Sequence, residues 1–306
     1  MNAIETSKLT KKYGNVAAVD QLDLQVPVGS ICGFLGRNGA GKTTTIKMLV
    51  GLAKPTSGTI SLMGKERKFG YCDNSNIGYL PDVPNFYNYM NGQEYLEFCG
   101  NLYNMEEKKR RSRVEELLKQ VDMYGTKTKI SGYSRGMKQR LGIAQALMNN
   151  PDIIFLDEPV SALDPIGRHE LINIIRSLGG KVTVFLSTHI LSDVENVCDY
   201  ALIIEKGKLL VADTVENIKK SHATDAAKIR LYLPGDNQRF ISLMKDQKGL
   251  TVKELNPSEF LLRGRDIQSL SKEILPLIAS SGIPLESFKA HVPSLEDIFL
   301  EVTQHA

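Results

Sequence analysis

The sequence predicts an α/β fold organised around a glycine-rich loop, with an antiparallel β edge, a helical subdomain and a small C-terminal α+β domain. Three observations predict it. A G-x-x-x-x-G-K-[ST] motif lies between an apolar run and a helical pattern, two later apolar runs end in polar residues, and an α+β pattern restarts near residue 216. At 306 residues the chain is long enough for about two domains. We expect residues 1–217 to form the first, with the helical subdomain at about 90–150, and residues 218–306 to form the second.

The first segment of the chain has the pattern of antiparallel strands. Residues 4–28 alternate apolar and polar positions, and Gly14 and Asn15 lie between two alternating runs, as in a β-hairpin. Tyr13 stands just before this turn, where its ring could stack on a purine base. A surface tyrosine in a hairpin is the common alternative.

The glycine-rich loop at residues 36–43 has the composition of a phosphate-binding loop. Glycines let the backbone turn tightly and point its N–H groups inward, and the start of a helix adds unpaired donors and a positive dipole end. Lys42 would bridge the β- and γ-phosphates, and the Thr43 hydroxyl would ligate Mg²⁺. The alternative is a glycine-rich turn that binds nothing. The residues expected to hold the nucleotide are Gly36, Asn38, Gly39, Ala40, Gly41, Lys42, Thr43 and Thr44.

Beyond the loop the pattern changes from strands to helices. Strands are predicted at 57–62 and 77–80. Residues 92–103, 106–121 and 136–149 then carry apolar side chains at three- and four-residue spacing. We therefore expect a helical subdomain inserted into the α/β core.

The strongest charge run lies in the second of these helices, at 108–111 and Arg113. Glu106 and Glu107 stand four residues before Arg110 and Arg111, which is the favourable order for ion pairs on a helix. A solvated helix face is therefore favoured over a role near anionic headgroups or an acidic partner.

Two later apolar runs end in groups that suit phosphate chemistry. The run at 151–158 is mainly apolar and ends in Asp157 and Glu158, as in a buried parallel strand whose carboxyl end faces a ligand. We expect Asp157 to meet the Mg²⁺ of Thr43. Because side chains alternate along a strand, Glu158 is then left to orient a water. A further strand ends at His189, which could touch a γ-phosphate, although a histidine in such a place is more often structural.

The last part of the chain predicts a separate βαββαβ domain, after a hairpin formed by 199–205 and 208–211. It contains no catalytic constellation. The expected strands are 228–233, 251–255, 259–262 and 285–289, and the expected helices begin at 238, 267 and 294.

Composition and charge argue against several classes of protein. The net charge of +3 is too small to indicate a nucleic-acid footprint, and no two of the four cysteines form a C-x₂-C pair typical of zinc sites. The sequence has no run of 18 apolar residues and no apolar signal segment at its start. We therefore expect a cytoplasmic protein, and any work that it does at a membrane is expected at the cytoplasmic surface of that membrane.

Taken in order, these residues resemble the nucleotide-binding subunits of ABC transporters. The resemblance covers about residues 3–217 and implies the ABC cassette of the P-loop NTPases. It is closest to the single-cassette bacterial exporter ATPases of the drug, bacteriocin and sodium efflux type, where the residues at 294–299 are also common. The matching set is Tyr13, the Walker A loop at 36–43, the signature at 133–137, Walker B Asp157 and Glu158, the D-loop at 161–164, and His189 of the H-loop.

The resemblance implies an ATPase that uses ATP and Mg²⁺, in which Lys42, Glu158 and His189 are catalytic. It further implies a head-to-tail dimer, either a homodimer or a pair of different cassettes. Ser134 and Gly136, at the start of a helix, would close the ATP site of the other chain, and Asp164 of the D-loop would also lie at the nucleotide. The expected partner is an integral membrane permease rather than a nucleic acid. The expected location is peripheral, at the cytoplasmic face of the cell membrane.

Some positions depart from the pattern of that family. Asp82 stands at the Q-loop position, where Gln or Glu is usual, so this expected Mg²⁺ ligand is one methylene shorter. Arg135 and Met137 replace Gly and Gln in the signature, and Arg37 replaces a common proline. Two alternatives to a transport ATPase remain open. One is a soluble ABC ATPase acting on DNA or ribosomes, against which the single cassette argues, and the other is a regulatory or immunity component that does not hydrolyse ATP.

Overall fold

The computed structural model describes residues 1–67, 74–221, 226–231, 237–245, 250–263, 267–291 and 293–304. The protein forms two compact units, of which the first comprises Met1–Val215 with Phe299–Ala306 and the second Glu216–Ile298. This division differs from the predicted domains at the end of the chain. Residues from Phe299 onward group with the first unit, because the Phe299 ring is 7% exposed and lines a pocket beside the glycine loop.

A six-stranded sheet forms the centre of the first unit. Neighbouring strands pair in parallel except β10 and β11, which are antiparallel. Every residue of β4, β8 and β9 is buried, as their near-continuous apolar sequences require. In sheet order the strands are β11 (Lys208–Thr214), β10 (Tyr200–Glu205), β4 (Ile31–Leu35), β9 (Thr183–Thr188), β8 (Ile153–Asp157) and β7 (Ile77–Leu80).

An antiparallel sheet packs beside this central sheet. The hairpin that joins its first two strands pairs Tyr13 with Val16 across the turn predicted at Gly14 and Asn15. One hydrophobic cluster, which includes Leu9, Phe34 and Phe155, joins the two sheets. The strands are β1 (Asn2–Tyr13), β2 (Val16–Leu22), β3 (Gln25–Pro27), β5 (Ser57–Leu62) and β6 (Lys65–Glu66).

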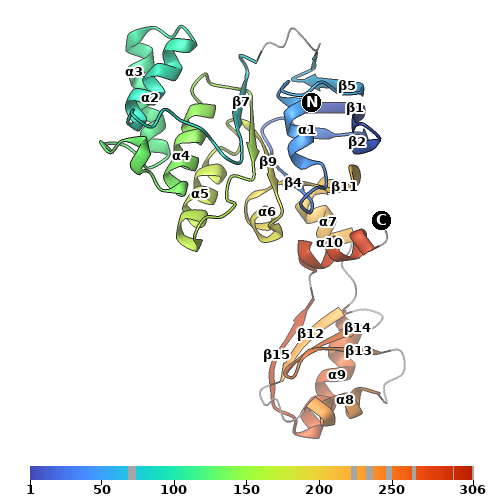
Figure 1. Cartoon of the computed structure of the whole chain (residues 1–306). Helices are drawn as coiled ribbons and strands as arrows, with labels where there is room; N and C mark the ends of the chain where they lie inside the picture. The colour runs from blue at the N-terminus through green and yellow to red at the C-terminus, as the bar shows by residue number, and fades with distance from the viewer. Residues whose placement is uncertain are drawn as a thin grey trace. The chain divides into compact units, whose positions relative to one another are not determined.

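The helices of the first unit lie around these sheets. Figure 1 shows α2 and α3 beyond α4, on the side of the central sheet away from β1 and β2. These three helices contact one another and form the predicted helical subdomain. These helices are α1 (Lys42–Leu49), α2 (Gly92–Leu102), α3 (Glu107–Gln120), α4 (Arg135–Ala146), α5 (Pro165–Ser177) and α6 (Leu191–Val197), with a 3₁₀ turn at Ile130–Gly132. The next helix, α7 (Val215–Ser221), belongs to the second unit from Glu216 onward.

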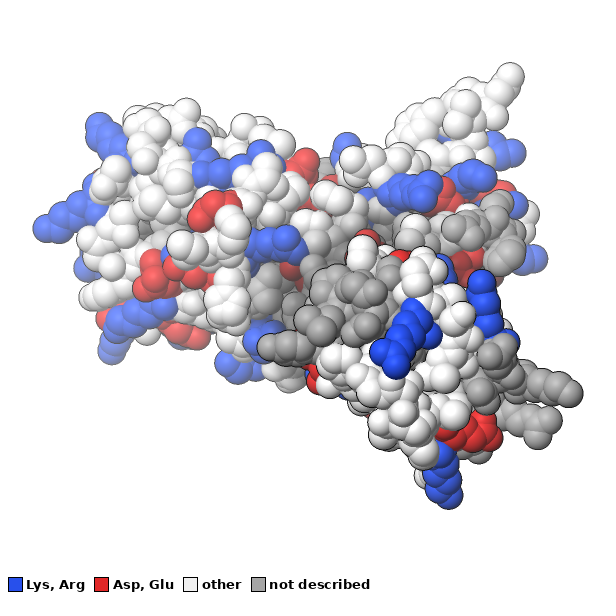
Figure 2. All heavy atoms as spheres, turned by 90° about the horizontal axis from the view of Figure 1, so that it is seen from below, with Lys and Arg blue, Asp and Glu red and all other residues white. Residues whose placement is uncertain are grey.

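The basic run of α3 is paired and solvated. Arg111 forms the predicted ion pair with Glu107 at 2.6 Å, and both side chains are mostly exposed. The other predicted pair is not formed, because Arg110 donates instead to the backbone carbonyl of Met105. On the face drawn in Figure 2, Lys and Arg side chains are interspersed with Asp and Glu. The paired and exposed charges of α3 favour the solvated helix face.

The second unit has a four-stranded sheet in the order β13-β14-β12-β15. Its core contains Phe240 and Phe260, whose ring centroids are 4.7 Å apart. Residues 232–233 of the first predicted strand lie outside the described residues. The elements are β12 (Ala226–Leu231), α8 (Asn237–Lys245), β13 (Thr251–Asn256), β14 (Glu259–Arg263), α9 (Ile267–Ser281) and β15 (Leu285–Ala290). The last helix, α10 (Leu295–Gln304), groups with the first unit from Phe299 onward. In the described part of the chain, no helix combines the length and apolarity that a membrane span needs.

Candidate active site

A pocket of about 440 Å³ lies where the glycine loop meets the carboxyl ends of the parallel strands β8 and β9. The ends of parallel strands share one edge of a sheet, and so segments that are distant in sequence meet there. The residues that line the pocket are Ala18, Asn38, Gly39, Gly41, Lys42, Thr43, Thr44, Asp82, Glu158, Ser161 and His189.

The glycine loop has a backbone that side chains would disrupt. A Cβ at Gly36 would lie 2.5 Å from the Ile204 carbonyl oxygen. Gly41 has φ 110°, and its Cβ would lie 2.5 Å from the Ala18 carbonyl oxygen. Gly41 also precedes α1 without a side-chain cap, so no side chain takes up the first donors of this helix. The loop therefore offers the cradle of backbone donors that a phosphate chain requires.

Lys42, Glu158 and His189 form one cluster. Lys42 Nζ lies 3.2 Å from Glu158 Oε1 and donates to the Gly36 carbonyl at 2.7 Å. His189 Nδ1 lies 2.8 Å from Glu158 Oε2. Glu158 has φ 48°, a conformation uncommon outside glycine, and its N–H is held by the Ser187 carbonyl and hydroxyl at 3.1 Å each. The three predicted catalytic side chains are thus in contact, with the glutamate between the two nitrogen groups.

Thr43 and Asp157 form a second, adjoining pair. The Thr43 hydroxyl donates to Asp157 Oδ1 at 3.2 Å, and the Ser187 hydroxyl donates to the same oxygen at 2.6 Å. Burial is the main cause that raises the pKa of Asp157. The hydrogen bonds from Ser187 and Thr43 lower this pKa, and the charges of Glu158 and Asp82 raise it further. Since a cation would offset this concentration of negative charge, the site suits a divalent ion.

The donor set also fits the character of Mg²⁺. In the described residues, no three His, Cys, Asp or Glu side chains gather to hold a metal by themselves. Mg²⁺ is commonly bound by one or two protein oxygens together with phosphate oxygens and water. Thr43 and Asp157 would supply the protein oxygens, and ATP would supply the phosphates.

The structure places the remaining predicted residues differently. Asp82 lines the pocket, but one of its carboxylate oxygens pairs with Arg135 at 3.2 Å and accepts from the Ser161 hydroxyl at 2.9 Å. Tyr13 is 55% exposed, with Lys11 Nζ 5.0 Å from its ring centroid. Tyr13 is not among the residues that line the pocket.

Ser134 and Gly136 also lie outside the lining of the pocket. The Ser134 hydroxyl accepts from the N–H of Met137 at 3.2 Å and so caps α4. Asp164 is the N-cap residue of α5 and makes no side-chain capping bond. These three residues are therefore placed at helix starts rather than against the pocket of their own chain.

Ser187 was not predicted from the sequence, although it contacts both carboxylate residues of the site. Its hydroxyl bonds Asp157 Oδ1 and accepts from the Glu158 N–H. No motif marks this serine, and only its place two residues before His189 on a buried strand could have suggested it.

In Ser187→Ala, we expect the Mg²⁺ concentration needed for half-maximal turnover to rise roughly tenfold. This is the scale of a lost hydrogen bond to a charged group. Loss of this bond also removes an interaction that lowers the pKa of Asp157. ATPase rates measured over a range of Mg²⁺ concentrations test this. Ser177→Ala, on α5, is the matched control, because that hydroxyl donates to the Ile174 carbonyl. An unchanged Mg²⁺ response in Ser187→Ala would show that the serine does not support the metal site.

Phe299 is the second residue that reasoning from the sequence did not place at the site. Together with residues of the glycine loop and His189, its ring lines a pocket of about 250 Å³. The sequence pattern at 294–299 could have drawn attention to this segment, but it could not have shown which residues lie around Phe299. The complete lining is Leu35, Gly36, Arg37, Asn38, His189, Leu191 and Phe299.

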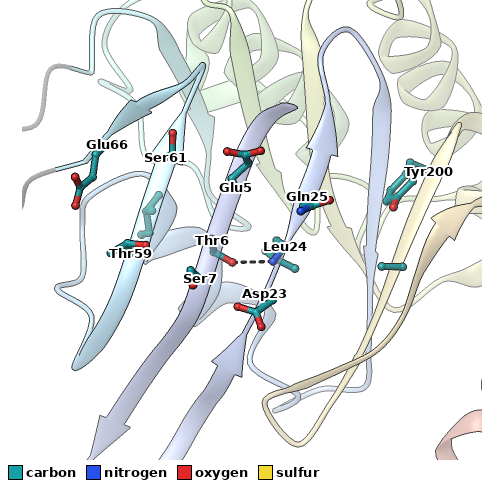
Figure 3. A pocket seen from close by; sticks show the side chains of 12 residues that line it. Glu5, Thr6, Ser7, Asp23, Leu24, Gln25, Thr59, Ser61, Glu66 and Tyr200 are labelled. Atoms are coloured by element: carbon teal, nitrogen blue, oxygen red, sulfur yellow. Dashed lines mark hydrogen bonds between the residues drawn. The ribbon is translucent and has the colours of Figure 1, made fainter. Parts of the chain in front are cut away.

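A larger hollow of about 670 Å³ lies over the antiparallel strands, where Glu5, Asp23 and Glu66 are among the lining residues (Figure 3). It shares no lining residue with the pocket at the glycine loop. The Thr6 hydroxyl in this hollow accepts from the Leu24 N–H at 2.9 Å and so serves the sheet itself.

The fold and site define an α/β nucleotide-binding protein with a phosphate loop and a carboxylate pair at the ends of parallel strands. The family model described as "ABC transporter" matches residues 19–161, and the model described as "ATP-binding protein DrrA1-3-like, C-terminal domain" matches residues 214–303. The chain is 36% identical to the ABC transporter ATP-binding protein YxlF of Bacillus subtilis, over 98% of this chain and 99% of that protein. It belongs to the family of ABC transporter ATP-binding proteins.

Two further comparisons agree with this membership. The chain is 36% identical to the bacitracin transport ATP-binding protein BcrA of Bacillus licheniformis, over 98% of this chain and 96% of that protein. A solved ATP-binding subunit of an ABC transporter superposes with a TM-score of 0.64 at 29% identity. That match covers 72% of this chain and 92% of the solved one.

Proposed function

We propose that this protein hydrolyses ATP, with Mg²⁺, to drive a separate membrane permease, and that the driven process is export. The observation that carries the proposal is the contact of Glu158 with both Lys42 and His189, beside the pair formed by Thr43 and Asp157. A protein that only bound nucleotide would not need a partly buried carboxylate between two nitrogen groups at that position. The similarity to a protein named for bacitracin transport supports coupling to a permease.

The residues of the site divide the work of phosphoryl transfer. ATP would supply the phosphoryl group, and a bound Mg²⁺ would offset negative charge on the phosphate oxygens. The glycine loop and Lys42 would hold the phosphates, and Thr43 and Asp157 would hold the metal. Glu158 accepts the proton of the attacking water, and His189, through its bond to Oε2, keeps the carboxylate oriented toward that water. Lys42 Nζ lies 3.2 Å from the other carboxylate oxygen and so helps to fix its position.

The proposed assembly is a head-to-tail dimer at the cytoplasmic face of the membrane. Ser134 caps a helix whose N-terminus is suited to an anion but lies outside the pocket of its own chain. A partner's phosphate would give that helix end its ligand. The two cassettes would be either identical or different chains, and both would bind the permease in the membrane.

Reconstitution tests the coupling to transport. A membrane permease should co-purify with this protein, and ATPase activity in vesicles should rise when a transported compound is added. A soluble or regulatory ABC ATPase would show neither result. Steady hydrolysis that no membrane partner binds or alters would favour that alternative.

We also propose that residues from about 218 onward regulate the protein or dock a partner, without holding the nucleotide. All phosphate and metal groups of the site precede this segment. A chain that ends at Ser221, the last residue of α7, should therefore bind ATP with near-normal affinity. Its turnover should fall, because removal of Phe299 opens the pocket beside Asn38 and His189. Binding of a fluorescent ATP analogue, with circular dichroism to check folding, makes the comparison.

In the full chain, Phe299→Ala should reproduce the lower turnover of the shortened protein. Leu300→Ala is the matched control, because the neighbouring Leu300 is 45% exposed on the same helix. A well-folded shortened chain with no affinity for nucleotide would mean that the proposed role of the C-terminal part is wrong.

A further inference from the structure

Two positions that depart from the family pattern are in direct contact. Arg135 Nη2 lies 3.2 Å from Asp82 Oδ1 and 3.2 Å from the Ser161 hydroxyl. The Ser161 hydroxyl in turn donates to the same carboxylate oxygen at 2.9 Å. The three side chains therefore form a closed triangle of hydrogen bonds around one charged pair.

The triangle joins three segments that are far apart in the sequence. Asp82 follows β7, Arg135 is the first residue of α4, and Ser161 lies between β8 and α5. One turn further along α4, Gln139 is fully buried and donates to the backbone carbonyl of Asp82 at 2.9 Å. The start of α4 is thus bonded at two points to the segment that follows β7.

The charges around Asp82 explain why an arginine is useful there. Asp82 and Glu158 are two acidic side chains that line the same pocket. The guanidinium of Arg135 places a permanent positive charge against this group of acids. An isolated pair that is 44% and 48% exposed would contribute little. This pair shares the Ser161 hydroxyl, and the buried Gln139 amide holds the backbone of Asp82, so the pair belongs to a network.

We propose that Arg135 is a positioning residue that ties the edge of the ATP pocket to the helix end that the chain offers to its partner. Asp82 and Ser161 line the pocket, and Ser134 and Gly136 form the helix end. The inference rests on the proposed shared site. A nucleotide that contacts Asp82 or Ser161 in one chain would then also affect the signature of that chain, and this signature completes the site of the other chain.

This role separates the binding of ATP from its turnover. Substitution of Arg135 leaves the glycine loop and the metal ligands of its own chain intact. In Arg135→Gln, the affinity for ATP should therefore stay within about twofold, while kcat falls roughly tenfold, the effect of a disturbed network of charged hydrogen bonds. Arg135→Lys keeps a positive donor in reach of both oxygens and should restore most of the kcat.

Hydrogen exchange of the full chain, without nucleotide, directly measures whether the pair of Arg135 and Asp82 stabilises the start of α4. The first turn of α4 includes the Met137 N–H bonded to Ser134. Its exchange should be roughly three- to tenfold faster in Asp82→Asn and in Arg135→Gln, as expected for a partly exposed charged pair within a network. The double variant should be no faster than either single variant, because both remove the same interaction.

The helix dipole makes the opposite prediction, which sharpens the test. Removal of a positive charge from a helix N-terminus should by itself stabilise the first turn and slow its exchange. Glu115→Gln and Lys119→Gln are the matched controls, because this ion pair on α3 is similarly exposed and should leave α4 unchanged.

Exchange of α4 that is unchanged or slower in Arg135→Gln would overturn the proposal. A double variant whose acceleration equals the product of the two single effects would do the same. A large loss of ATP affinity would show that Arg135 itself holds the nucleotide, and normal kcat would remove its role in turnover. Absence of ATPase activity in the unmodified chain would refute the proposed function, and the exchange rates would still decide whether the tie exists.

Discussion

Glu158→Gln should keep ATP binding and lower ATP turnover by roughly 10²–10⁴-fold, the usual contribution of a general base. The change preserves the size of a side chain that is only 12% exposed. An amide cannot accept the proton of the attacking water, and it also loses the charge that pairs with Lys42 at 3.2 Å. The phosphate loop, Thr43 and Asp157 remain, so the groups that hold nucleotide and metal are unaffected.

This variant should also collect in the ATP-bound dimer, because hydrolysis normally ends that state. Gel filtration in Mg·ATP should give a dimer for Glu158→Gln and a monomer when ATP is omitted. Glu107→Gln, which alters an exposed ion pair on α3, controls for the loss of one carboxylate and should turn over ATP normally. Near-normal turnover in Glu158→Gln, or a monomer in Mg·ATP, would contradict the role of this glutamate.

The sequence located those elements that have local boundary signals. The predicted strands at 57–62 and 77–80 coincide with β5 and β7, because glycine, proline and polar residues mark their ends. The helix α6 was not anticipated, since its seven residues are too few to show a clear helical period. The helix α7 was missed for the same reason.

In the site, local motifs gave the chemistry but not the contacts. Asp157 and Glu158 could be assigned different partners because their side chains alternate along a strand. No local pattern could reveal that Arg135 meets Asp82, since that contact depends on how α4 packs against β7. A Cβ at Gly78 of β7 would lie 2.0 Å from the Ala146 carbonyl oxygen of α4, which shows how close that packing is.

A mixed dimer of two inactive variants should recover part of the ATPase activity if the site is shared. Lys42→Ala removes the amine that pairs with Glu158, and Ser134→Arg removes the cap of α4 and adds bulk at its start. In the mixed dimer one site combines both defects. The other site pairs the intact phosphate loop of the Ser134 variant with the intact signature of the Lys42 variant.

If the two sites work independently, the mixed dimer should recover at most about half of the activity of the unmodified dimer, because only one of its two sites is intact. A site contained in a single chain predicts no recovery, and so does strict coupling in which both sites must act together. A cross-link between cysteines introduced near Asn38 of one chain and Ser134 of the other separates these two cases. The described native cysteines Cys32, Cys99 and Cys198 are buried and should not compete. If ATP is bound and the cross-link between chains still fails to form, the shared site is refuted, because the phosphate loop and the signature then never meet across the dimer.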